Sequence, residues 1–229
     1  MKKILCLLLT LVLSFGIVSC KKDKGSDDND GGNNNNTANQ TSAVEKINDT
    51  INSSSPTQIV TKVGYTAPGQ QEIISSYTTE RDAKEGVERF EFHVLRYATI
   101  EEGIPGGLKE LRGIIWKDAD GSILNSEGDV WSSADAVGYL AESLTLRDSY
   151  VKSYETSDNG NDITAYVTVA NSERVFGVNI DANGDIKLEI DTNGTYLYEV
   201  TVTYTTVSGA TVSVETSYDY KVIDLEVNN

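Results

Sequence analysis

The chain has few of the side chains on which most enzyme and metal sites depend. Its 229 residues include one histidine, His93, and two cysteines. These are too few for the four nitrogen and sulfur ligands of the usual zinc sites. A Ser-His-Asp triad would have to use His93, and the G-x-S-x-G turn of many hydrolases is absent. We therefore expect no catalysis, no metal site and no cofactor.

Basic residues are also scarce. Lysine and arginine number 19 against 35 acidic residues, which gives a formal net charge of −16. A surface of this sign repels nucleic-acid phosphates and anionic lipid headgroups. The composition thus predicts that nucleic acid is not a partner. Any attachment to a membrane would have to come from something other than surface charge.

No apolar run is long enough for a comfortable transmembrane helix. The longest, residues 4–18, falls short of the roughly 20 residues that such a helix needs. It follows Lys2 and Lys3 and is succeeded by the small residue Ser19 and by Cys20. A charged start, an apolar stretch and a small residue at its end are the three parts of a secretory signal. We expect residues 1–19 to be removed. The loss of Lys2 and Lys3 would change the formal net charge from −16 to −18.

The junction at Cys20 points to a lipid anchor. The run Ile-Val-Ser-Cys at residues 17–20 resembles the lipobox of bacterial lipoproteins, in which the cysteine carries a diacylglyceryl group. The resemblance implies that Cys20 is lipidated. The protein would then be anchored in the cell envelope, on the outer face of the cytoplasmic membrane or on the outer membrane. Cys20 would be the last cysteine left, so no intrachain disulfide is expected.

The segment that follows reads as a tether. Residues 20–42 are rich in Asp, Asn and Gly and contain almost no aliphatic side chain. Such a composition cannot bury enough apolar surface to offset the entropy of ordering the chain. We expect a disordered spacer, followed by one folded domain over residues 43–229.

The domain is expected to open with a helix and to continue mainly as strands. Ser42 and Glu45 form the sequence pattern of a capping box, and a proline at position 56 follows the end of the helix. A second amphipathic helix is predicted over 133–144. Period-two alternation predicts strands over 59–65, 73–79, 89–98, 113–117, 122–124, 163–169, 176–180 and 186–190. His93 falls within a strand, on the face opposite Phe90, Phe92 and Val94.

The clearest pattern is the last hairpin, which turns at Ser208-Gly209. Alternating Tyr and Val residues on each of its strands predict one apolar face and an opposite, solvent-exposed face of Thr, Ser and Glu. We assign ligand binding to this face, which comprises Tyr196, Tyr198, Val200, Val202, Tyr204, Val212, Val214 and Tyr218.

Two Asp-rich turns offer a different chemistry. Residues 118–122 and 181–185 carry oxygen-bearing side chains at alternate positions, as calcium loops do. Both place glycine at the fourth position rather than the sixth. They are more simply hairpin turns, in which glycine supplies a positive φ.

The order of elements resembles the LolA/LppX-like lipid carriers of bacterial envelopes. A capped helix leads into a meander, a second helix interrupts it, and the strand–turn–strand run of residues 178–186 precedes the Tyr-rich hairpin. The resemblance implies an α+β fold: a single strongly curved antiparallel sheet, or half-barrel, packed against an N-terminal and a mid-chain helix. It also implies a lipid or other hydrophobic small molecule bound on the concave face.

A second interpretation stays open. The strands also fit a surface-exposed β-sandwich that binds a glycan or a protein. A sandwich needs neither of the two expected helices, so we favour the half-barrel. In either case we expect a monomer.

Overall fold

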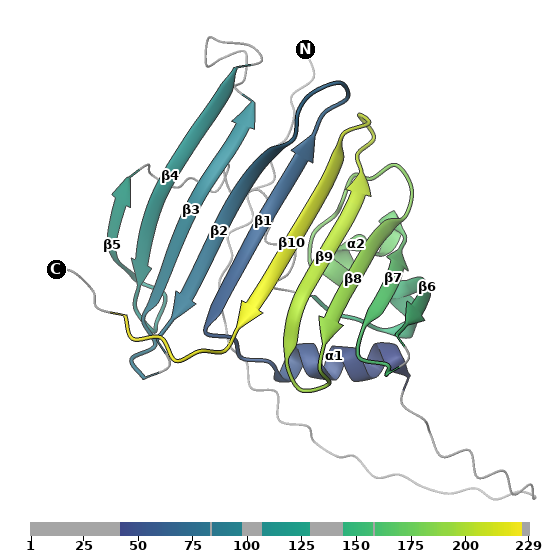
Figure 1. Cartoon of the computed structure of the whole chain (residues 1–229), viewed down its shortest axis with the longest axis horizontal. Coiled ribbons are helices and arrows are strands. Elements are labelled where there is room, and N and C mark those ends of the chain that lie inside the picture. Colours follow the sequence, from purple (N-terminus) through teal and green to yellow (C-terminus); the bar gives the residue numbers. More distant parts are fainter. Residues whose placement is uncertain (1–41, 83, 98–106, 129–143, 158, 226–229) are drawn as a thin grey trace, which may run out of the picture.

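The computed structural model describes residues 42–82, 84–97, 107–128, 144–157 and 159–225. These residues form a ten-stranded antiparallel sheet with short helices on one of its faces (Figure 1). The strands are β1 (Gln58–Thr66), β2 (Ile73–Arg81), β3 (Glu88–Tyr97), β4 (Leu108–Lys117), β5 (Ile123–Gly128), β6 (Val151–Thr156), β7 (Ile163–Val167), β8 (Ile186–Thr192), β9 (Leu197–Thr205) and β10 (Thr211–Asp219).

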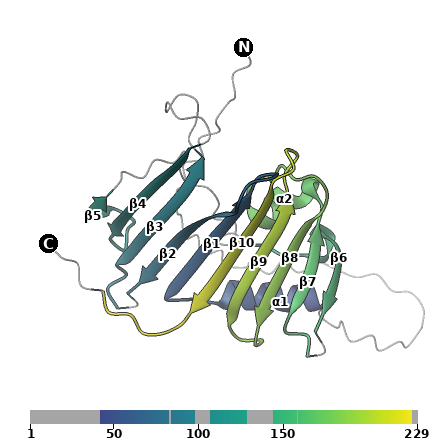
Figure 2. The same ribbon diagram turned by 45° about the horizontal axis from the view of Figure 1, so that its top comes forward.

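The sheet consists of two meanders joined at its centre. Its strand order is β5-β4-β3-β2-β1-β10-β9-β8-β7-β6, so the first and last strands of the chain pair with each other. The edges are β5 and β6, and the sheet does not close into a barrel (Figure 2). The prediction of a single open antiparallel sheet is confirmed.

The helix α1 (Ala43–Ser53) begins where the capping box predicts. The backbone N–H of Glu45 donates to Ser42 Oγ at 3.1 Å, and that of Ser42 donates to Glu45 Oε2 at 3.3 Å. One side chain of α1 also contacts the segment that precedes β6. The Asn48 Oδ1 atom accepts from the N–H of Leu146 at 2.8 Å, which fixes the helix against the loop before β6.

One predicted strand is wrong. The alternation of Phe176, Val178 and Ile180 predicts a strand, but the chain forms the short helix α2 (Ser172–Phe176) and then a bend. Gly177 ends the helix in the left-handed conformation, with φ of 71°. Phe176 and Ile180 are both buried nonetheless, so the apolar pattern reports burial rather than strand geometry. The Asp-rich run 181–185 is therefore not a hairpin turn between two strands.

The predicted helix over 133–144 lies almost entirely outside the described residues. The last of these positions, Leu144, is described and buried. Among the described residues, α1 and α2 lie beside β7, β8 and β9 (Figures 1 and 2). No helix in the described part of the chain lies over β1 to β5.

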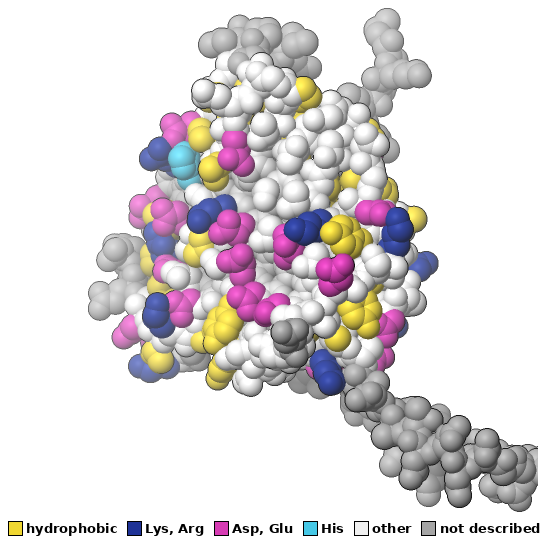
Figure 3. Space-filling model, turned by 45° about the vertical axis from the view of Figure 1, so that its right-hand side comes forward, with side chains coloured by type: hydrophobic (Ala, Val, Ile, Leu, Met, Phe, Trp, Pro, Cys, Tyr) yellow, Lys and Arg dark blue, Asp and Glu magenta, His cyan; other side chains and the backbone are white. Residues whose placement is uncertain are grey.

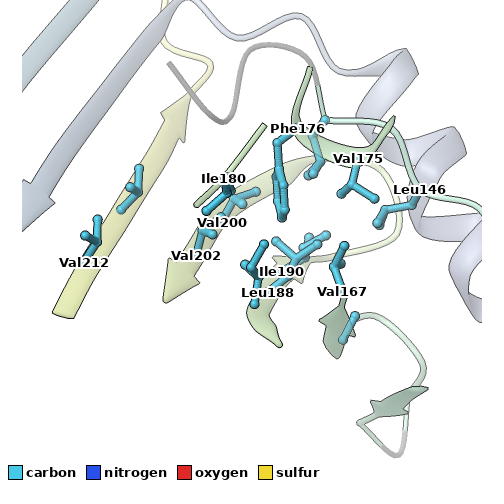
Figure 4. Close-up of a cluster of buried hydrophobic side chains, with 14 of the residues drawn as sticks. Leu146, Val167, Val175, Phe176, Ile180, Leu188, Ile190, Val200, Val202 and Val212 are labelled. Atoms are coloured by element: carbon cyan, nitrogen blue, oxygen red, sulfur yellow. The ribbon is translucent and has the colours of Figure 1, made fainter. Parts of the chain in front are cut away.

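The two faces of the sheet differ sharply in polarity. We call the face that carries α1 and α2 the inner face. Its core contains side chains from most of the strands, and Leu188, Val200 and Val202 are each at most 1% exposed. Val175 and Phe176 of α2 pack against these three side chains (Figure 4). The outer face is more polar, and acidic side chains of β8 to β10 lie on it among a few exposed apolar ones (Figure 3).

Candidate functional site

The residues assigned to ligand binding from the sequence fall into three groups. Val200, Val202, Val212 and Val214 lie on the inner face and are at most 7% exposed. Figure 4 shows Val200 and Val202 close to Ile180 and Phe176. These four valines thus pack against protein in this structure, and their predicted role in ligand binding stays a prediction.

Tyr204 and Tyr218 form the second group. Both are half-buried and pack against the edge of the same core. Burial raises the pKa of the Tyr204 phenol above its ordinary value because the phenolate would lose solvation. The predicted face is therefore correct for six of the eight positions.

Tyr196 and Tyr198 do not belong to that face. Asp191 pairs with Glu199 and Thr192 pairs with Leu197, so Tyr198 is one extra residue in β9. This irregularity puts Leu197 into the core and leaves Tyr196 and Tyr198 45% and 43% exposed. Because a β-bulge reverses the alternation of the residues beyond it, the Tyr-Val pattern crosses from one face to the other.

The half of the inner face without a described helix carries an aromatic cluster. We call the side chains of Tyr77, Phe90, Phe92, Val94, Leu111 and Ile115 the aromatic strip. The rings of Tyr77 and Phe90 are 6.4 Å apart at an interplanar angle of 12°, and those of Phe90 and Phe92 are 5.9 Å apart at 30°. The β3 side chains are at most 5% exposed, whereas Leu111 and Ile115 of β4 are partly exposed beside them.

The register of β3 and β4 arranges the strip in pairs. Phe90 lies opposite Ile115, Phe92 opposite Gly113, and Val94 opposite Leu111. Gly113 is required here because a Cβ atom at this position would lie 2.6 Å from Cζ of Phe92. The ring of Phe92 therefore lies against the backbone of β4 at Gly113.

Each end of the strip is charged. At one end Glu88 lies opposite Lys117, whose Nζ is 3.4 Å from Glu88 Oε1, and Arg81 Nη2 is 2.9 Å from Glu88 Oε2. At the other end Arg96 lies opposite Lys109. The apolar strip thus lies between charged side chains at both of its ends.

Polar side chains of the kind used in catalysis or metal binding lie on the outer face. His93 lies there, as predicted, with Nε2 2.7 Å from Glu110 Oε1. Hydrogen bonds from Arg112 and then from His93 hold the pKa of Glu110 below its ordinary value. The described residues contain no group of three or more His, Cys, Asp or Glu side chains placed to hold a metal ion.

A shallow depression of about 270 Å³ also lies on the outer face. Its lining includes Asp162, Glu189, Asp191 and Glu199. Partial burial, and then a hydrogen bond with Asp162, raise the pKa of Asp191 above its ordinary value. Repulsion from the charges of Asp162 and Glu199 adds to the same upward shift.

The turn at 118–121 is the hairpin that the sequence predicts. The N–H of Asp118 donates to the carbonyl of Ser122 at 2.9 Å, and Gly121 adopts a φ of 83°. Among the described helices, none is long and apolar enough to cross a membrane.

Sequence reasoning identified the apolar face of β3 but did not join it to β4. The first half of β4 was missed because Lys109, Glu110 and Arg112 interrupt its apolar residues. The available signal was the alternation of Leu111, Gly113 and Ile115, in which a glycine takes one apolar position.

No protein family and no curated protein matches the sequence. A match among solved structures is the crystal structure of a LolA superfamily protein from Nitrosomonas europaea. It has 12% identity and a TM-score of 0.29, and it covers 80% of this chain and 93% of that chain. At this level of similarity, no statement about the fold or the function of this chain rests on the match.

Proposed function

We propose that this protein binds a lipid or another hydrophobic ligand along the aromatic strip while a lipid on Cys20 anchors it to a membrane of the cell envelope. The observation that carries the proposal is the strip itself. An open sheet gives half of its inner face three aromatic rings and three aliphatic side chains, and both described helices lie on the other half. Leu111 and Ile115 leave part of this apolar cluster exposed, and exposed apolar surface binds apolar ligands through the hydrophobic effect.

Leu111 and Ile115 provide the access in this proposal. Both belong to β4, next to the short edge strand β5, and both are partly exposed. A ligand would contact these side chains first and the rings of Phe90 and Phe92 next. The role of the protein is then to hold its ligand close to the membrane, without a chemical step.

Binding of N-phenyl-1-naphthylamine, an uncharged fluorescent probe of apolar sites, tests the proposal. A form that starts at Ser26 is suitable because every described strand, helix and core residue lies beyond position 41. We expect saturable binding that Leu111→Gln weakens at least fivefold. Leu108→Gln is the matched control, since Leu108 lies on the outer face of the same strand and is 59% exposed. Equal binding by both variants, or no binding by the wild type, would refute the proposal.

A further inference from the structure

Three tyrosines at one end of β9 and β10 lie together outside the aromatic strip. Tyr196 and Tyr198 are 45% and 43% exposed. The ring centroids of Tyr196 and Tyr220 are 4.6 Å apart at an interplanar angle of 49°. We call Tyr196, Tyr198 and Tyr220 the tyrosine group. Exposed rings that lie together are a common mark of a binding surface.

Hydrogen bonds hold the tyrosine group in place. The Nδ2 atom of Asn193 donates to the Tyr198 hydroxyl at 2.8 Å, and its Oδ1 atom accepts from the backbone N–H of Tyr196 at 2.8 Å. The Tyr220 hydroxyl donates to the carbonyl oxygen of Leu197 at 2.9 Å. Because these contacts are already made, a ligand that lies on the rings would not have to order them first.

The shallow depression on the outer face adjoins the tyrosine group. Glu199, which lines the depression, directly follows Tyr198 at the bulge of β9, and both side chains are exposed. Asp162 lines the depression from the segment before β7. The Thr192 hydroxyl, next to the turn that leads to the tyrosines, donates to the carbonyl oxygen of Asn161 at 2.8 Å and holds that segment close. The rings and the depression therefore form one surface.

The lining of the depression supplies mainly hydrogen-bond acceptors. The carboxylates of Asp162, Asp191 and Glu199 accept hydrogen bonds but donate none when ionised. The hydroxyls of Thr164 and Thr201 can do both. An anionic ligand would be repelled by the carboxylates. The lining therefore suits an uncharged ligand that carries several hydroxyl donors.

A cation suits the same lining less well. The Nζ atom of Lys187 lies 2.7 Å from Oε1 of Glu189, a fourth carboxylate of the lining. This carboxylate already has a cationic partner, and a further cation would approach the like charge of Lys187.

We infer that the tyrosine group and the adjoining depression form a binding site for a neutral glycan, on the face of the sheet opposite the aromatic strip. A sugar ring has C–H groups on its faces, which suit the electron-rich face of a tyrosine ring, and hydroxyls at its edge, which suit carboxylate acceptors. The depression of about 270 Å³ is slightly smaller than the roughly 300 Å³ of the smallest ligand pockets. It therefore holds one sugar ring, and the next ring of the glycan lies on Tyr198.

Saturation-transfer NMR with the form that starts at Ser26 tests the inference. The probes are neutral tetrasaccharides of glucose, galactose, mannose and N-acetylglucosamine, with tetragalacturonate as an anionic sugar and spermidine as a cation. We expect at least one neutral sugar to receive magnetisation from the protein, and neither tetragalacturonate nor spermidine to do so. No transfer to any neutral sugar, or stronger transfer to spermidine, would overturn the inference.

Variants locate the sugar. Tyr198→Ala should weaken binding of the sugar about tenfold, because one ring contact is lost, and Tyr198→Phe should keep most of the affinity. Tyr154→Ala is the matched control, since it removes a ring that is 41% exposed on the edge strand β6. Equal weakening by Tyr198→Ala and Tyr154→Ala would place the sugar elsewhere and refute the site. If Tyr198→Ala fails to fold, Tyr196→Ala makes the same comparison.

The glycan site and the lipid site can be tested independently. Leu111→Gln changes the inner face alone, so it should weaken binding of N-phenyl-1-naphthylamine and leave binding of the sugar unchanged. Tyr198→Ala should have the reverse effect. Loss of both ligands in either variant would contradict two separate sites.

Discussion

Thr61 of β1 and Thr216 of β10 are register partners at the centre of the sheet, and their buried hydroxyl oxygens lie 3.1 Å apart. They join the two meanders on the inner face. Thr61→Val or Thr216→Val alone leaves one buried hydroxyl without its partner and should cost about 1–3 kcal/mol. The double variant should cost clearly less than the sum, as urea unfolding will measure. Additive costs would show that the two hydroxyls do not interact.

Asp82 links the β2–β3 turn to the C-terminal segment. The N–H groups of Glu85, Lys84 and Leu225 donate to its carboxylate and hold the pKa of Asp82 below its ordinary value. The ionised Asp82 carboxylate therefore stabilises the folded state. This contribution is fully present above the ordinary carboxyl pKa and is lost as the pH falls through the lowered pKa of the folded state. Asp82→Asn should therefore destabilise the protein near pH 7, and the difference should shrink in acid. A difference that is constant with pH would contradict this linkage.

The contribution of Asp191 to stability should depend on pH in the opposite sense. Its pKa is raised by partial burial and then by Asp162 and Glu199, so the ionised form is the unfavourable one. Its contribution is fully present below the ordinary carboxyl pKa and is lost as the pH rises through the raised value. Asp191→Asn should stabilise the protein near pH 7 and have little effect in acid. Chemical denaturation across this range measures it, and a destabilised variant at neutral pH would be the contrary result.

Substitution of Cys20 tests the proposed lipid anchor. Cells fed a palmitate analogue that can be tagged should label the wild-type protein and not Cys20→Ser. The variant should also leave the membrane fraction or stay unprocessed. Cys6→Ser is the matched control, because Cys6 would be removed with the signal. Label on Cys20→Ser would exclude this cysteine as the attachment site.

Local features of the fold were predictable where one signal dominates. The capping box of Ser42 and Glu45 gives the start of α1, and Asp118 to Gly121 gives a hairpin turn. The alternation of Val200 and Val202 gives their burial. In each case the chemistry of a few neighbouring residues decides the structure.

Features that depend on distant residues were not predictable. The pairing of β1 with β10 joins segments about 150 residues apart, as Thr61 and Thr216 illustrate. The extra residue Tyr198 continues the Tyr-Val alternation, so its bulge leaves no mark in the pattern. The aromatic strip was hidden for a related reason: it is formed by β3 and β4 together, and the sequence of β4 by itself is too polar to suggest it.

The most direct test of the account maps where a lipid lies. A fatty acid that carries a diazirine near the end of its chain can be photo-crosslinked to the form that starts at Ser26, and the labelled peptides can be identified by mass spectrometry. We predict labels on β3 and β4 at inner-face residues such as Phe92 and Leu111, which unlabelled fatty acid should compete away. Labels confined to outer-face residues such as Leu108, or none that compete, would contradict the claim that the aromatic strip is the binding site.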